Sequence, residues 1–318
     1  MRKAVFRRFK GRRWTSPVAA GFVLSLTCFA LRGVDALAAP PARSPDGVTI
    51  LRDVKYRAAD DKHCSLDLAL PTPRGGAPRP AIVVIHGGGW IEGDKSSFAS
   101  DEHGVPGNIV EFSRLGFVAA TINYRLSGTA PFPAALDDCQ CAVRFLRAHA
   151  DDYHIDAERI GAYGNSAGGH LALLLGLMDQ PVGGDSPPPV LSSRVQAVVS
   201  DSGPLDLVRQ HQQNQLRGVI EGFMGGPPVE ARLAAYRRAS PASHVSGRTP
   251  PLLLIYGVGD EQVDVKTADD FVTALGRGGR QDTTYVRLAE VGHCPHSLVR
   301  VPCLREMVDA FFVRTLRR

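Results

Sequence analysis

Short apolar runs, each bounded by glycine, proline or polar residues, recur along the chain from residue 48 onward. Eight of them have the length of strands, at 48–56, 65–70, 81–85, 117–123, 159–163, 195–200, 252–256 and 283–288. Apolar residues at helical spacing mark five further segments, at 108–115, 133–148, 166–178, 265–277 and 300–315. Strands that alternate with helices predict an α/β fold, with a mostly parallel central sheet of about eight strands and helices on both faces.

Two segments depart from this alternation. Residues 39–47 hold several prolines, which favours a linker, so the folded domain is expected to span residues 48–318. Residues 205–250 contain Gly225-Gly226-Pro227-Pro228 followed by a helix-like stretch at 229–238. This segment predicts a small cap-like insertion over the carboxyl ends of the strands.

The first 38 residues have the pattern of an export signal. Seven basic residues and no acidic one lie in residues 1–13, an apolar run follows at 18–31, and Ala36-Leu37-Ala38 suits cleavage by a signal peptidase. The apolar run is shorter than the 18 or more residues typical of a membrane span, although an uncleaved anchor is the alternative. We therefore expect a signal peptide at 1–38, a periplasmic or secreted protein, and no stable membrane span after cleavage.

The leader also explains the net charge. The whole chain carries +5 at pH 7, and without the seven basic residues of the leader the remainder carries −2. The remainder lacks an aromatic-interleaved basic face, so nucleic-acid binding is not expected. The five cysteines after the leader are an odd number, and of these Cys294 and Cys303 are the candidates for a disulfide, which spacing alone does not decide.

A G-x-S-x-G pattern, Gly164 to Gly168, lies directly between a predicted strand and a predicted helix. A serine on so tight a turn is held with its hydroxyl exposed, and its neighbours must be small because a side chain would clash with the turning backbone. The N-terminus of the following helix directs N–H groups toward developing negative charge. Ser166 is therefore the candidate nucleophile, and a glycine-rich turn without chemistry is the alternative.

The strand at 81–85 continues into His86-Gly87-Gly88-Gly89-Trp90. Acyl transfer produces a tetrahedral oxyanion, which glycine N–H groups can approach closely because they carry no Cβ. The N–H groups of Gly88, Gly89 and Ala167 are the expected oxyanion hole. A phosphate-binding loop is the alternative, but no Lys-Ser/Thr pair follows the glycines.

The partners of a nucleophilic serine follow it in chain order and lie just past strand ends. Asp260 follows the strand at 252–256 and is the candidate carboxylate, with Glu261 and Asp264 as competitors. His293 follows the strand at 283–288 and is the candidate general base, with His296 as its rival. The H-x-x-H spacing of these histidines suits a metal, but no third ligand clusters with them and no metal is expected.

Four residues are candidates for contact with a substrate. Asn165 adjoins the nucleophile, Trp90 borders the oxyanion turn, and Phe223 and Met224 lie in the insertion. Ordinary core packing is the alternative interpretation for Trp90, Phe223 and Met224.

Taken with Asn123-Tyr124-Arg125-Leu126 and Ser240-Pro241-Ala242-Ser243, the HGGGW and GNSAGGH motifs give the chain a resemblance to the α/β-hydrolase superfamily. More narrowly it resembles the hormone-sensitive-lipase-like carboxylesterases and the bacterial acetylxylan and feruloyl esterase group. The resemblance implies an α/β-hydrolase fold and hydrolysis of small-molecule or carbohydrate esters through an acyl-enzyme on Ser166, without a cofactor. Asp264 and Cys294-Pro295 depart from the usual pattern of this family. These departures bear on the shape of the acyl pocket and not on the identity of Ser166, Asp260 and His293.

Two other functions fit the same residues. An amidase, formamidase or peptidase would use the same serine, histidine and oxyanion hole, because fold does not determine the reaction. A binding protein that retains a hydrolase scaffold is the second alternative, but such a scaffold has no physical need for a serine at the turn or a histidine at 293.

Overall fold

A mixed β-sheet organises the part of the chain that the structure describes. The computed structural model describes residues 42–43, 47–57, 63–73, 75–99, 107–178, 191–213, 215–278, 282–295 and 302–317, all within the compact unit Ala36–Arg318. The strand order is β1-β2-β3-β5-β4-β6-β7-β8-β9. The pairs β1/β2, β2/β3 and β3/β5 are antiparallel, and all five pairs from β5 through β4 to β9 are parallel.

The predicted mostly parallel sheet is confirmed, with one short additional strand. The strands are β1 (Ala42–Arg43), β2 (Val48–Lys55), β3 (Ser65–Pro71), β4 (Arg79–Ile85), β5 (Val118–Ile122), β6 (Ile155–Asn165), β7 (Ala197–Asp201), β8 (Leu252–Gly257) and β9 (Thr283–Leu288). β1 lies inside the predicted linker at 39–47, where a regular element was not expected. Two residues suffice for it, because strand pairing requires only backbone N–H and C=O groups.

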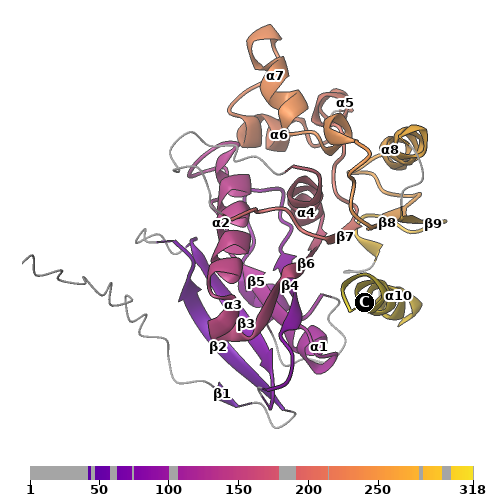
Figure 1. Cartoon of the computed structure of the whole chain (residues 1–318). Coiled ribbons are helices and arrows are strands. Elements are labelled where there is room, and N and C mark those ends of the chain that lie inside the picture. Colours follow the sequence, from indigo (N-terminus) through magenta and orange to yellow (C-terminus); the bar gives the residue numbers. More distant parts are fainter. Residues whose placement is uncertain are drawn as a thin grey trace, which may run out of the picture. The chain divides into compact units, whose positions relative to one another are not determined.

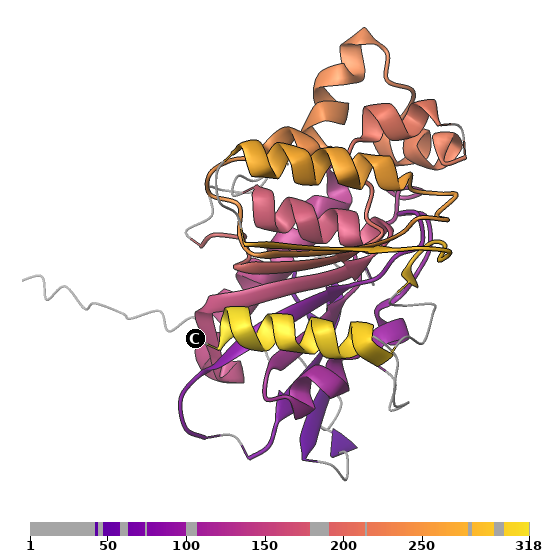
Figure 2. The same ribbon diagram turned by 90° about the vertical axis from the view of Figure 1, so that its right-hand side faces the viewer.

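Helices cover both faces of the sheet. The helices are α1 (Ile109–Arg114), α2 (Ala134–Ala148), α3 (Ala150–Tyr153), α4 (Ala167–Leu177), α5 (Leu207–Gln212), α6 (Arg217–Met224), α7 (Glu230–Arg238), α8 (Val265–Arg277) and α10 (Pro302–Leu316), with 3₁₀ turns η1 (Lys95–Phe98) and η2 (Pro241–His244). α2, α4 and α8 pack on one face, and α1 and α10 pack on the other (Figure 2). Alternate residues of β4 serve the two cores, with Val83 in the first and Ile82 and Val84 in the second.

The segment between β7 and β8 forms α5, α6, α7 and η2, which lie together beyond one end of the sheet (Figure 1). The helix-like stretch at 229–238 appears as α7. α5 and α6 were not predicted, because helices of 6 and 8 residues show too few turns to establish a period. Ile220 and Tyr236 are completely buried and attach this segment to the main core.

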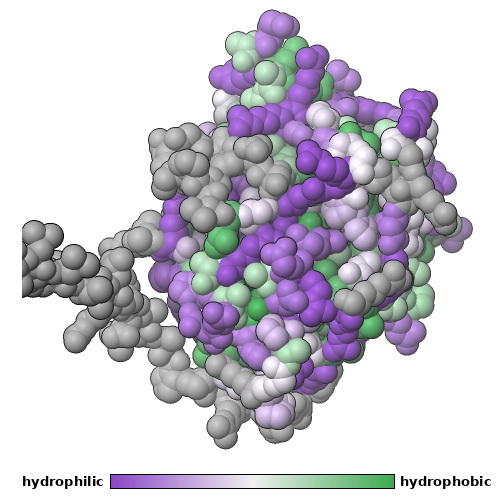
Figure 3. Space-filling view, in the orientation of Figure 1, coloured by the Kyte–Doolittle hydropathy of each residue, from purple (hydrophilic) through white to green (hydrophobic). Residues whose placement is uncertain are grey.

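Few large apolar side chains reach the surface of the described residues. They are Ile91, Leu191, Val229, Val258 and Met307. The face shown in Figure 3 is accordingly dominated by hydrophilic residues, with small scattered apolar areas. Among the helices of the described part, none has the length and hydropathy needed to cross a membrane.

The C-terminal helix α10 packs against β6 in the middle of the sheet through Phe312 and Leu316. Phe312 is completely buried, and its ring lies where a Cβ on Gly161 of β6 would be only 2.8 Å away. Phe312 also meets Phe112 of α1 edge to face, with ring centroids 5.6 Å apart. Phe312 thus connects α10 with both β6 and α1, and the buried Leu304, Val308, Phe311 and Leu316 complete the apolar face of the helix.

Replacing Phe312 by alanine should lower the free energy of unfolding by about 3–5 kcal/mol, because it removes a buried ring and leaves a cavity between α10 and β6. Urea unfolding followed by circular dichroism measures the change. Met307→Ala on the same helix is the control, since Met307 is 36% exposed and should cost far less. Equal losses in the two variants would contradict this account of α10.

Candidate active site

The turn between β6 and α4 holds Ser166 in a backbone conformation that few non-glycine residues adopt. Ser166 has φ 50° and ψ −122°. A Cβ on Gly168 would lie 2.0 Å from the carbonyl oxygen of Ile85, and one on Gly164 would lie 2.3 Å from the backbone of Gly168. Both positions require glycine, because the first turn of α4 packs directly on the backbone of β4 at Gly168 and on the end of β6 at Gly164.

The three predicted residues Ser166, His293 and Asp260 lie in one hydrogen-bonded row. His293 Nε2 is 2.9 Å from Ser166 Oγ, and His293 Nδ1 is 2.7 Å from Asp260 Oδ2. The other oxygen of Asp260 accepts hydrogen bonds from the backbone N–H groups of Gln262 and Val263 at 2.8 and 2.9 Å. The carboxylate of Asp260 is completely buried and the imidazole of His293 is 11% exposed. The backbone N–H groups thus fix the buried Asp260 carboxylate, and the carboxylate in turn fixes the orientation of the His293 ring.

The structure also separates Asp260 from its competitors. Asp264 caps the N-terminus of α8 by accepting a hydrogen bond from Lys266 N–H, and its second oxygen accepts one from the Gln213 amide at 2.8 Å. Glu261 is exposed to solvent. His296, the rival to His293, lies outside the described residues.

The glycine turn after β4 lies against Ser166. A Cβ on Gly87 would be 3.3 Å from the Cβ of Ser166. Gly88 and Gly89 have φ 99° and 58°, conformations that favour glycine. His86 supports this turn from the side away from Ser166: its Nδ1 lies 2.8 Å from the Gly87 carbonyl oxygen, and its ring stacks on Tyr124 at 4.3 Å. Tyr124 Oη donates a hydrogen bond to the His86 carbonyl oxygen.

A cavity of about 300 Å³ opens at this point. Its lining includes the predicted residues Gly88, Gly89, Trp90, Asn165, Ser166, Ala167 and His293. It also includes Cys294, which the sequence connected with the shape of the acyl pocket. Six further lining residues were not predicted, namely Ile91, Glu92, Pro204, Leu216, Val219 and Gln262. The cavity is therefore bordered both by Ser166 and His293 and by the residues of the expected oxyanion hole.

Phe223 and Met224, predicted to be pocket walls, do not line this cavity. Phe223 is buried and stacks on the indole of Trp90, with centroids 4.3 Å apart. An earlier part of α6 forms the wall instead, because Val219 Cγ1 lies 3.0 Å from where a Gly89 Cβ would be. All these residues are apolar, so composition carried no signal to tell which of them would face the cavity.

Trp90 and His170 connect the glycine turn with α4 and with the insertion. Trp90 has φ 60° and is buried, and its ring meets His170 edge to face at 5.1 Å. His170, in the first turn of α4, donates from Nε2 to the carbonyl oxygen of Ala239 at 2.7 Å. Burial lowers the pKa of His170 to about 4, although the hydrogen bond to Ala239 opposes this shift. The imidazole is therefore neutral at physiological pH.

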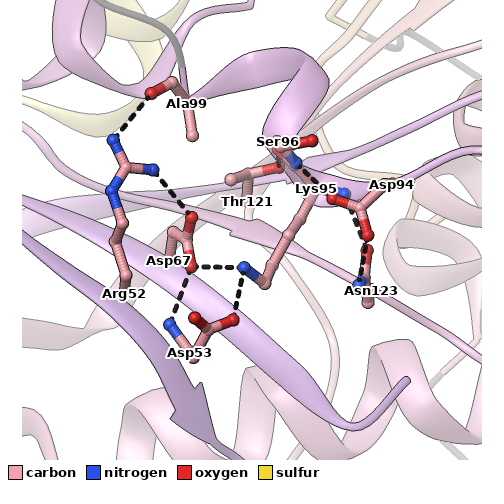
Figure 4. A network of polar contacts seen from close by, with 9 residues as sticks. All are labelled: Arg52, Asp53, Asp67, Asp94, Lys95, Ser96, Ala99, Thr121 and Asn123. Atoms are coloured by element: carbon pink, nitrogen blue, oxygen red, sulfur yellow. Dashed lines mark hydrogen bonds and ion pairs between the residues drawn. The ribbon is translucent and has the colours of Figure 1, made fainter. Parts of the chain in front are cut away.

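A buried polar network anchors the chain where it leaves the glycine turn (Figure 4). Lys95 Nζ lies 2.6 Å from Asp67 on β3 and 2.9 Å from Asp53 on β2. The Asn123 amide accepts from Lys95 N–H at 2.6 Å and donates to Asp94 at 2.8 Å. Burial by itself lowers the pKa of Lys95, but the hydrogen bonds that its ammonium group donates to the carboxylates of Asp67 and Asp53 outweigh burial and raise the pKa above its ordinary value.

The candidate disulfide is not formed. Cys294 and Cys303 are both thiols: Cys294 is buried beside His293, and Cys303 is exposed on α10. Within the described part of the chain, no three His, Cys, Asp or Glu side chains form a group that could hold a metal ion.

Comparison with known proteins places this chain among esterase relatives. The BD-FAE family model matches residues 66–275. The probable carboxylic ester hydrolase LipM of Mycobacterium tuberculosis is 30% identical over 67% of this chain and 49% of its own length. Esterase LipC of the same organism is 29% identical over 83% of this chain and 68% of its own. The chain thus spans about half the length of LipM and two thirds of LipC.

Among solved structures, a bifunctional GH43-CE protein of Bacteroides eggerthii is similar with a TM-score of 0.72 and 28% identity. The similarity covers 86% of this chain and 38% of that protein. Together with the topology, these similarities identify the fold as that of α/β hydrolases.

The neutral His170 should make stability fall as the pH is lowered. Between pH 6.5 and about 4, the unfolded chain binds a proton at this residue and the folded chain does not, which amounts to about 3 kcal/mol over the whole interval. His170→Gln keeps an N–H donor for Ala239 but does not titrate. Its free energy of unfolding, measured by urea unfolding from pH 7 to 4.5, should decrease less than that of the wild type; parallel curves would refute the assignment.

Removing Lys95 should be costly, because it leaves the carboxylate of Asp67 buried without its main counter-charge. Lys95→Met should lower the free energy of unfolding by about 3 kcal/mol. Asp53→Asn is the matched control: Asp53 is 75% exposed, so losing its ion pair should cost below about 1 kcal/mol. Chemical unfolding at pH 7 distinguishes the two variants, and a larger loss in Asp53→Asn would contradict the network described here.

Proposed function

Because the chain belongs to the BD-FAE family, we propose that it is a serine hydrolase that cleaves short-chain carboxylic esters. The observation that carries the proposal is the hydrogen-bonded row Ser166–His293–Asp260 at the edge of a cavity lined by Gly88, Gly89 and Ala167. These are the parts that acyl transfer needs: a nucleophile with an adjacent base, an orienting carboxylate, and N–H donors for the oxyanion.

The proposed reaction has two halves. His293 Nε2 takes the proton of Ser166 Oγ as the oxygen attacks the ester carbonyl, and the resulting oxyanion is stabilised by the N–H groups of Gly88, Gly89 and Ala167. His293 then protonates the leaving alcohol, which gives an acyl-enzyme on Ser166. A water molecule, deprotonated by His293, repeats the attack and releases the acid. Asp260 holds the Nδ1–H tautomer and stabilises the imidazolium in both halves.

The size of the cavity supports a short acyl chain. Its volume of about 300 Å³ is at the small end of the range for ligand sites. Apolar side chains form part of its wall, namely those of Leu216 and Val219 in the insertion and Pro204 just before it. Acetyl and butyryl groups fit this description better than long fatty acyl chains. The alcohol part is proposed to be a small molecule or an acetylated or feruloylated carbohydrate, on the resemblance stated above.

Export of the enzyme is part of the same proposal. It rests on the basic and apolar pattern of residues 1–38, which lie outside the described residues. A periplasmic or secreted esterase would meet its substrates outside the cytoplasm.

The proposal predicts that Ser166→Ala and His293→Ala each lower kcat for p-nitrophenyl acetate on the order of 10⁴-fold or more. The double variant should be no worse than either single one, since the two residues act as a unit. Initial rates with acetate, butyrate and octanoate esters measure both the loss and the chain-length preference. A folded wild type that is no faster than the variants would refute the proposal and favour a non-catalytic scaffold.

A matched ester and amide separate the two hydrolase alternatives. The esterase proposal expects p-nitrophenyl acetate to be cleaved much faster than p-nitroacetanilide, relative to their uncatalysed rates. The opposite order would favour the amidase or formamidase reading of the same triad.

A further inference from the structure

The end of strand β7 contacts both the nucleophile and the loop that carries the general base. The N–H of Ser166 donates to the carbonyl oxygen of Asp201, the last residue of β7, at 2.7 Å. The N–H of Cys294, directly after His293, donates to Oγ of Ser202 at 3.0 Å. Two catalytic elements that are far apart in the chain are therefore tied to consecutive residues of one strand end.

Ser202 itself is rigidly held. It is completely buried, and its N–H donates to the carbonyl oxygen of Ile255 on β8 at 2.9 Å. Its hydroxyl is thus placed by two neighbouring strands of the sheet rather than by a surface loop. An acceptor fixed in this way sets the position of whatever donates to it.

The backbone conformation of Ser202 has a cost that the hydrogen bond to its hydroxyl offsets. Ser202 has φ 56°, in the left-handed region where glycine is the residue of lowest strain. A serine at this position has a conformational cost, which the hydrogen bond from Cys294 N–H offsets.

The loop of His293 is held on both sides of the imidazole. Before it, the carbonyl oxygen of Val291 accepts a hydrogen bond from Gly259 N–H at 2.9 Å, in the loop that carries Asp260. After it, Cys294 has φ 54°, and its N–H donates to the side chain of Ser202. The first tie is between backbones and is insensitive to side-chain identity, whereas the second is made by one replaceable hydroxyl.

We propose that Ser202 is a positioning residue for the general base, whose hydroxyl fixes the backbone of Cys294 and thereby the distance from His293 to Ser166. The inference rests on the proposed function of the triad. Ser202 is not among the described residues that line the cavity. It therefore acts through the His293 loop rather than on a substrate.

The test compares three variants of the full chain. Ser202→Gly removes the acceptor and relieves the strain, and Ser202→Ala removes the acceptor and keeps the strain. Ser200→Ala is the control, because Ser200 is equally buried in β7 and its hydroxyl makes no hydrogen bond to the described part of the His293 loop. Thermal unfolding establishes that each variant is folded at the assay temperature.

Both Ser202 variants should lower kcat for p-nitrophenyl acetate between about 10- and 100-fold with little change in KM, since they misplace the base and leave the cavity walls in place. The proton shared by His293 Nδ1 and Asp260 should give a downfield imidazole resonance in the wild type and in Ser200→Ala. In the Ser202 variants that resonance should broaden or move upfield.

Wild-type kcat and an unchanged resonance in folded Ser202→Gly would overturn the inference, as would an equal loss of kcat in Ser200→Ala. Failure of the proposed function gives a different result: the wild type itself would lack esterase activity, while the imidazole resonance would still report whether Ser202 positions the His293 loop.

Discussion

Backbone contact without intervening side chains, where β4, β6 and α4 meet, is the constraint on which the candidate active site depends. The missing Cβ of Gly168 allows the first turn of α4 to rest on the end of β4. Since the glycine turn continues directly from β4, this contact places Gly88 and Gly89 beside Ser166. A larger residue at the contact would separate Ser166 from Gly88 and Gly89, the N–H donors of the proposed reaction.

Parallel strand order then supplies the remaining groups. β8 and β9 run parallel to β6 and β7, so their carboxyl ends reach the same edge of the sheet as the nucleophile. Asp260 and His293 follow those ends, and their loops are linked to each other and to β7 by hydrogen bonds. Sheet topology thus brings Ser166, His293 and Asp260 to one edge of the sheet. Hydrogen bonds between the loops then fix the distances between these residues.

The insertion belongs to the site as well as covering it. Phe223 stacks on Trp90 of the glycine turn, and the C-terminal end of α7 accepts a hydrogen bond from His170 of α4. Because these contacts are buried, the insertion cannot shift without disturbing the elements that hold Ser166 and the glycine turn. The same arrangement explains why the cavity wall is Val219, near the start of α6, while Phe223 at its end is part of the core.

Local properties of the sequence determined the existence of eight strands and the main helices, and pointed to Ser166, Asp260 and His293. Apolar periodicity and the need for small residues in a tight turn involve residues that are close together in the chain. They can therefore be recognised in the sequence without a structure. Tertiary structure alone decided between Asp260 and Asp264, kept Cys294 and Cys303 as thiols, and turned Phe223 away from the cavity. It also paired Lys95 with Asp67 and Cys294 with Ser202. Each of these outcomes depends on the distance between segments far apart in the chain, which only the packing of the sheet and its helices sets.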